Sequence, residues 1–127
     1  MNSAVISIGS NIEPEKNVKY ALSLLSSDFT VTKITEFIRT KPVGLTNQPD
    51  FLNGAVLVYT DYDLETVEKL LKKFEKDMGR IRTENKFGPR QIDFDVIVWN
   101  DEIIDEDVYS RGFLQRFIKQ LLSANGP

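Results

Sequence analysis

The chain has 127 residues, with 16 Lys and Arg against 19 Asp and Glu, a formal net charge of −3, and neither histidine nor cysteine. The missing cysteine excludes disulfides, zinc–thiolate sites, iron–sulfur clusters and thiol nucleophiles, and the missing histidine excludes Ser-His-Asp triads and zincin motifs. Any acid–base or metal chemistry must therefore use carboxylates, Lys, Tyr, Arg and backbone groups. The length and an apolar fraction of 41% predict one soluble domain over residues 1–127, with 124–127 as a candidate disordered tail.

The sequence carries no recognisable membrane or export signal. No apolar run reaches the length that spans a bilayer, and the N-terminal MNSAVISIGSN has no basic segment ahead of an apolar one. We therefore expect a cytoplasmic protein.

Hydrophobic periodicity predicts seven elements. They are a strand over 4–8, a helix over 14–26, strands over 29–40 and 51–60, a helix over 64–78, a strand over 91–99 and a final helix after Ser110. Pro14 suits a first helical turn, Asp63 and Ser110 are candidate N-caps, and Gly79 suits a helix end. The loop 40–50 contains two prolines and a glycine, and the strands on either side of it are expected to pair antiparallel.

The order of these elements predicts the fold. Strand, helix, strand, strand, helix, strand matches the split βαβ arrangement of a ferredoxin-like α/β sandwich. We therefore predict an α+β fold in which two helices cover one face of an antiparallel sheet and a C-terminal helix is added. The other face would remain available for ligands, loops or that last helix.

Charge is distributed unevenly towards the C-terminal end. Residues 79–90 (GRIRTENKFGPR) sum to +3, whereas 91–107 carry seven acids and no base. Asp93 and Asp95 would share one face of the predicted strand, about 7 Å apart. Ile97 and Trp99 would continue that face, and the opposite face would hold Ile92, Phe94, Val96 and Val98. Two carboxylates at a partly desolvated strand start are unfavourable unless a cation joins them, and Mg²⁺ is the economical candidate.

The basic segment that precedes these acids suits phosphate binding, because arginine forms bidentate hydrogen bonds with phosphate oxygens. Carboxylates for Mg²⁺ beside arginines for phosphate indicate nucleotide phosphoryl transfer, which needs no histidine. The alternatives are that Asp93 and Asp95 form a solvated face or a local salt bridge, and that Gly9-Ser10-Asn11 is a simple turn. A Gly-rich loop of the P-loop type is absent, which excludes a P-loop NTPase.

Together these segments resemble the hydroxymethyldihydropterin pyrophosphokinase family of folate biosynthesis. The resemblance covers about residues 4–113 and lies in IGSN (8–11), RTKPVG (39–44), QPDFLN (48–53), GRIR (79–82) and FGPRQIDFDV (87–96). It implies a ferredoxin-like fold and a Mg²⁺-dependent transfer of diphosphate from ATP to 6-hydroxymethyl-7,8-dihydropterin, releasing AMP.

The resemblance also implies roles for individual residues. Two Mg²⁺ ions would bind at Asp93 and Asp95, and the catalytic arginines would be Arg80, Arg82 and Arg90. The pterin would be bound by Thr40, Pro42, Val43, Phe51, Asn53 and Phe113, with the two phenylalanines stacked on its ring. The nucleotide would be bound by Lys72, Glu75, Phe87, Val96 and Arg111. ATP and a reduced pterin are thus the expected partners, nucleic acid and membranes are not, and a monomer is favoured.

The chain departs from the family pattern between the acidic strand and Arg111-Gly112-Phe113. Fifteen residues separate Asp95 from Arg111, so the family's Pro-His segment is missing, and the C-terminal part is expected to be shortened. A divergent, non-catalytic module that binds a pterin or nucleotide on the same fold is therefore an alternative. An RNA-recognition domain is disfavoured by a pI of about 5.0 and by the lack of the aromatic motif of such domains.

Overall fold

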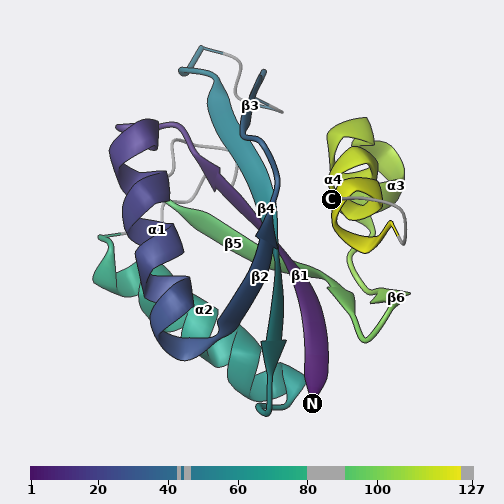
Figure 1. Cartoon of the computed structure of the whole chain (residues 1–127). Coiled ribbons are helices and arrows are strands. Elements are labelled where there is room, and N and C mark those ends of the chain that lie inside the picture. Colours follow the sequence, from purple (N-terminus) through teal and green to yellow (C-terminus); the bar gives the residue numbers. More distant parts are fainter. Residues whose placement is uncertain (43, 45–46, 80–90, 124–127) are drawn as a thin grey trace.

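The computed structural model describes residues 1–42, 44, 47–79 and 91–123. The strands are β1 (Asn2–Ser10), β2 (Thr30–Ile34), β3 (Ile38–Thr40), β4 (Phe51–Thr60), β5 (Asp93–Trp99) and β6 (Glu102–Ile103). The helices are α1 (Pro14–Asp28), α2 (Leu64–Asp77), α3 (Asp107–Ser110) and α4 (Gly112–Leu122). Figure 1 shows one sheet with α1 and α2 on one side and α3 and α4 on the other.

The strand order of the sheet is β2-β4-β1-β5-β6, with β3 also paired to β4, and every pairing is antiparallel. The two central strands, β1 and β4, are therefore separated in sequence by α1, β2 and β3. This is the split arrangement of a ferredoxin-like sandwich. The predicted α+β fold is confirmed, as is the antiparallel pairing across the loop 40–50.

Two apolar cores lie on opposite faces of the sheet. The core under α1 and α2 contains Ile6, Ile8, Val56, Val58 and Phe94 from the sheet and Ala21, Leu25, Val67, Leu71 and Phe74 from the helices. The core under α4 is smaller and contains Val5, Leu57, Ile97 and Val98 with Leu114, Phe117 and Leu121. Because α4 covers only part of its face, the rest of that face remains available for a site.

The ends of the first two helices follow the predicted signals. Pro14 lies in the first turn of α1, where its missing N–H is not needed. The Asp63 side chain accepts the N–H of Thr66 at 2.8 Å, and hydrogen bonds from the side chain and the backbone of Thr66 hold the pKa of Asp63 below its usual value. Gly79, which follows the end of α2, has a φ of +86°, a conformation that favours glycine.

The single strand predicted over 29–40 is instead two strands, β2 and β3. Thr35, which lies between them, donates its N–H to Ala55 O, and its Oγ1 accepts the N–H of Ala55, both at 2.9 Å. Because a hydroxyl takes the position of a backbone carbonyl in the ladder, regular pairing stops there and resumes at Ile38 opposite Asn53.

A register shift in β5 corrects the predicted alternation of its side chains. Val96 pairs with Ile6 and Val98 pairs with Val5, so Ile97 is an extra residue in β5. Such a bulge reverses the facing of the residues that follow it. The prediction was therefore wrong for two positions: Val98 joins Ile97 in the core under α4, and Trp99 packs against the core under α1 and α2. The strand also begins at Asp93 rather than Gln91.

The segment that leads to the last helix also differs from the prediction. Ser110 lies in α3, where its Oγ donates to Asp107 O at 3.3 Å, and α4 begins after Arg111. The predicted Ser110 cap was therefore wrong, and β6 and α3 had no periodic pattern by which to find them. None of the helices in the described part of the chain is long and apolar enough to cross a bilayer. The predicted tail, 124–127, lies outside the described residues.

Candidate active site

The uncovered half of the sheet face presents polar side chains in rows across three strands. Gly9 on β1 pairs with Asn53 on β4 and with Asp93 on β5, so these three residues form one row. In the next row, Ser7 pairs with Ala55 and Asp95. Directly paired residues point to the same face, and neighbouring strands lie about 4.8 Å apart. An amide and two carboxylates are thereby held on one rigid surface.

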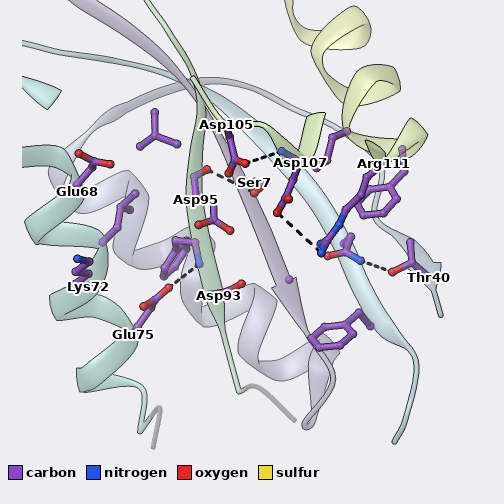
Figure 2. Close-up of a pocket in the computed structure, with 18 of the residues that line it drawn as sticks. Ser7, Thr40, Glu68, Lys72, Glu75, Asp93, Asp95, Asp105, Asp107 and Arg111 are labelled. Carbon is purple, nitrogen blue, oxygen red and sulfur yellow. Dashed lines mark hydrogen bonds and ion pairs between the residues drawn. The ribbon is translucent and has the colours of Figure 1, made fainter. Parts of the chain in front are cut away.

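A cavity of about 570 Å³ opens over these rows (Figure 2). The predicted residues that line it are Thr40, Phe51, Asn53, Lys72, Glu75, Asp93, Asp95, Val96, Arg111 and Phe113. The lining includes Lys41 but not Pro42. Val43, Arg80, Arg82, Phe87 and Arg90 lie outside the described residues, so their predicted roles remain predictions. The fold thus brings together side chains from both substrate groups that the sequence predicted.

One end of the cavity has a flat floor. A Cβ on Gly9 would lie 2.6 Å from Asn53 Oδ1, a distance too short for a side chain to be added without displacing Asn53. The Asn53 amide is oriented by Thr40, because Nδ2 donates to Thr40 Oγ1. Glycine at this position therefore leaves the Asn53 amide lying across the sheet, open to the cavity.

Aromatic side chains reach this end of the cavity from two elements. Phe51 is the first residue of β4 and pairs with Thr40 on β3. Phe113 is in the first turn of α4 and packs edge-on against Phe117, with ring centroids 5.9 Å apart. Both rings line the cavity. A planar heterocycle suits such a surface, because the phenylalanine rings can stack on its faces while the amide forms hydrogen bonds with its polar edge.

The other end of the cavity is acidic. Part of the Asp95 side chain reaches solvent, but the surrounding protein removes much of its water. This desolvation, with the negative charges of Asp93, Asp105, Glu75 and Asp107, raises the pKa of Asp95 to about 7. A cation between the carboxylates would reverse that effect, because opposite charge favours the ionised form.

The helix α2 supplies the wall beside β5. Figure 2 shows Glu68, Lys72 and Glu75 along this helix, facing the strand. Glu68 and Lys72 are exposed, whereas Glu75 is 5% exposed. Glu75 Oε2 accepts the backbone N–H of Phe94 at 2.8 Å. The carboxylate predicted to approach the nucleotide is therefore bonded to the strand that carries the aspartates.

Sequence reasoning missed the acids on the opposite wall. Asp107 N–H donates to Asp105 Oδ1 at 2.9 Å, and the Asp107 carboxylate lies 3.9 Å from the Arg111 guanidinium. Both acids line the cavity. The run of seven acids over 91–107 was the available signal, but only its first two members had strand spacing from which a direction could be inferred. Ser7 was missed as well, because it is the one polar residue in the apolar run 4–8.

The cavity offers two adjacent carboxylates rather than a complete protein cage for a metal. Among the described residues, no group of three or more acidic side chains has the arrangement of a metal site. Mg²⁺ commonly binds to one or two carboxylates and completes its coordination with water and substrate phosphates. Asp93 and Asp95 therefore fit a Mg²⁺ ion that arrives with a phosphorylated substrate.

Asn11, in the IGSN segment, holds two segments together. Its Nδ2 donates to Gln48 Oε1 at 2.7 Å and to Pro49 O at 3.0 Å. The side chain is buried. These bonds tie the end of β1 to the chain that enters β4, and so they fix the approach to Phe51.

Comparison with known proteins agrees with this geometry. Residues 5–123 match the model of the family described as 7,8-dihydro-6-hydroxymethylpterin-pyrophosphokinase (HPPK). The 2-amino-4-hydroxy-6-hydroxymethyldihydropteridine pyrophosphokinase of Bacillus subtilis is 37% identical over 109 residues, which are 84% of this chain and 65% of the relative. The protein of the same name in Haemophilus influenzae is 29% identical over 110 residues, covering 84% of this chain and 68% of the relative. A folate synthesis bifunctional protein of Arabidopsis thaliana is 36% identical over 105 residues, covering 81% of this chain and 22% of the relative.

Proposed function

This chain belongs to the 7,8-dihydro-6-hydroxymethylpterin-pyrophosphokinase family, and we propose that it transfers the β,γ-diphosphate of ATP to the hydroxymethyl group of 6-hydroxymethyl-7,8-dihydropterin in folate biosynthesis. One observation carries the proposal. A single cavity contains a flat floor with an oriented amide and two phenylalanines at one end and a pair of aspartates at the other. Those are the groups needed to hold a planar heterocycle next to a nucleotide phosphate.

In the proposed reaction the hydroxymethyl oxygen forms a bond to the β-phosphorus of ATP. The bond between that phosphorus and the oxygen bridging to the α-phosphate breaks, and AMP leaves with the electron pair. The hydroxyl proton is released. Most of the catalysis in such a transfer comes from positioning and from neutralising charge, so the absence of histidine does not oppose it.

The pterin would occupy the flat end of the cavity. Asn53, oriented by Thr40, would hydrogen-bond the polar edge of the ring, and Phe51 and Phe113 would pack on its faces. The shared row of Asn53, Gly9 and Asp93 supports this orientation. A ring bound by Asn53 directs a substituent along the row towards the aspartates.

The nucleotide would occupy the acidic end, with Mg²⁺ as the proposed cofactor. Asp93 and Asp95 would hold it, and two ions are expected with ATP. When bound, Mg²⁺ supplies neutralisation of the charge that develops on the phosphates. Lys72, Val96 and Arg111 line the same space and would contact the nucleotide. The roles of Arg80, Arg82 and Arg90 on the phosphates are part of the proposal, as are a monomeric state and a cytoplasmic location.

The proposal is tested by measuring AMP release from ATP with and without the hydroxymethyl pterin. The wild-type chain should release AMP only when pterin and Mg²⁺ are both present. Asp95→Asn should lower the rate by about three orders of magnitude or more, because it removes one of two metal-binding carboxylates. Asp101→Asn is the matched control, since Asp101 is an exposed acid in the turn after β5 and does not line the cavity.

Wild-type protein that binds the pterin but releases no AMP under saturating ATP and Mg²⁺ would contradict the transfer reaction. That result would favour the non-catalytic binding module instead. Equal loss in Asp95→Asn and Asp101→Asn would show that the effect is not specific to the cavity.

A further inference from the structure

Glu75 is a buried charge that the proposed reaction does not itself require. It is 5% exposed, and it is the charged member of the buried polar residues in the described chain. Burying a carboxylate away from water costs roughly several kcal/mol unless hydrogen bonds or ion pairs compensate for the lost hydration. The hydrogen bonds that Glu75 makes therefore decide what its carboxylate does, and one of them goes to the backbone of β5.

One of its partners, the Phe94 N–H, lies in the N-terminal half of β5. The strand β6 pairs with β5 at Val98 and Trp99. Within the described residues, no strand lies beside the N-terminal half of β5 on that side. The Phe94 N–H donates to Glu75 on α2 rather than to β1, and Figure 2 shows Glu75 on the helix beside this edge of the strand.

The bond acts at the centre of the acidic pair. Phe94 lies between Asp93 and Asp95, and its side chain is buried on the opposite face, with its ring 6.3 Å from that of Phe74 on α2. The packing of the two rings sets the distance between β5 and α2, but it does not prevent β5 from rotating about its own axis. A hydrogen bond from the backbone is directional. Together the two contacts fix the position and the orientation of the backbone between Asp93 and Asp95.

We propose that Glu75 is a positioning residue, which holds the open edge of β5 through the Phe94 N–H so that Asp93 and Asp95 keep the orientation that binds metal and nucleotide. The metal part of this inference rests on the proposed function, whereas the backbone part does not. Glu75 thus acts through the strand rather than by direct contact with the nucleotide.

Two substitutions of Glu75 distinguish the effect of its hydrogen-bond acceptor from the effects of its charge and its volume. Glu75→Gln keeps an oxygen that can accept the Phe94 N–H but removes the charge. Glu75→Met keeps the volume but removes the acceptor, so the Phe94 N–H loses its partner and some stability should be lost with it. Val67→Ala is the control for lost stability, since Val67 is fully buried on α2 and does not line the cavity.

The first measurement is amide hydrogen exchange of Phe94 by NMR in the metal-free protein. The second is calorimetric binding of a non-hydrolysable ATP analogue with Mg²⁺. Glu75→Met should speed Phe94 exchange and weaken Mg²⁺-dependent binding by about 10-fold or more each, the effect of losing one charged hydrogen bond. Glu75→Gln should stay within about threefold of wild type in both. Val67→Ala should lower the melting temperature and change neither.

The inference is overturned if Glu75→Met leaves both quantities at their wild-type values. It is also overturned if Glu75→Gln keeps Phe94 protected but loses nucleotide binding as strongly as Glu75→Met, because the charge would then act directly. If the wild-type protein binds no nucleotide with Mg²⁺, the proposed function fails. Phe94 exchange in Glu75→Met then decides alone whether Glu75 holds the strand.

Discussion

The two halves of one sheet face have opposite properties although they belong to the same three strands. In the half covered by α4, Val5 pairs with Leu57 and Val98, and all three are buried. Two rows away, Gly9 pairs with Asn53 and Asp93 on the floor of the cavity. The backbone provides the same rigid spacing in both halves. What differs is the side chain at each row and whether a helix covers it.

The covered half therefore contributes mainly to the stability of the fold, and the open half mainly to ligand binding. The covered half removes apolar area from water, which contributes about 25 cal/mol per Å² to folding. The open half keeps like charges close together, which opposes folding in the absence of a cation. Substitutions in the two halves should therefore affect different measurements, and the following changes test this in order of decreasing effect.

The largest expected effect lies in the covered half. Phe117 is fully buried under α4, so Phe117→Ala should lower the free energy of unfolding by about 3–5 kcal/mol through lost burial and the cavity left behind. Urea denaturation measures it. A loss below about 1 kcal/mol would mean that α4 contributes little to stability, and the contrast between the halves would then be wrong.

The next change affects the floor of the open half. In Gly9→Ala the new Cβ would lie 2.6 Å from Asn53 Oδ1, so the Asn53 side chain must move from its place beside Thr40. Pterin affinity should fall by about 10–100-fold, the effect of misplacing one or two hydrogen bonds. Calorimetry with the pterin measures it. Ser3→Ala, on the same strand but outside the cavity, removes a hydroxyl without adding volume and is the control; equal losses in both variants would argue against the clash.

The smallest effect concerns charge in the open half. The pKa of Asp95 is raised to about 7, so between about pH 4, the unfolded value, and pH 7 the native state binds more protons than the unfolded state. Stability of the metal-free protein should therefore fall as pH rises through this window. Asp95→Asn should be more stable than wild type above pH 7 by about 1 kcal/mol, after allowance for solvent screening. Below pH 4 the difference should vanish.

Thermal unfolding between pH 4 and pH 8 checks this charge effect. Asp101→Asn, in the exposed turn after β5, should follow the wild-type curve. A stability difference that does not change with pH would mean that the gain in Asp95→Asn comes from packing rather than from charge.

Local signals in the sequence predicted the elements where one residue type has one strong conformational preference. Pro14, Asp63 and Gly79 each lie at the helix end that their chemistry favours. The prediction was wrong where a side chain competes with the backbone or where an extra residue enters a strand. The Thr35 hydroxyl divides one predicted strand into two, and the bulge at Ile97 exchanges the faces of Val98 and Trp99.

In the candidate site, too, local patterns predicted some residues, and others depended on tertiary contacts. Strand spacing was enough to place Asp93 and Asp95 on one face, because alternation is a property of the local backbone. The resemblance to a family predicted that Asn53, Phe51 and Phe113 belong to one site, which their spacing in the sequence alone does not indicate. Neither approach found Ser7 or Asp107, because their roles depend on which strand or turn lies next to them.

The sequence by itself thus determined the order of the elements, the α+β class and the pair of carboxylates, since these depend on periodicity and on local conformational preference. Only the tertiary structure decided that Gly9 lies between Asn53 and Asp93, that Asp105 and Asp107 face Asp95, and that Glu75 bonds the Phe94 N–H. The physical reason is that such contacts join residues far apart in the chain. Strand register and helix packing bring them together, and no short segment of sequence contains that information.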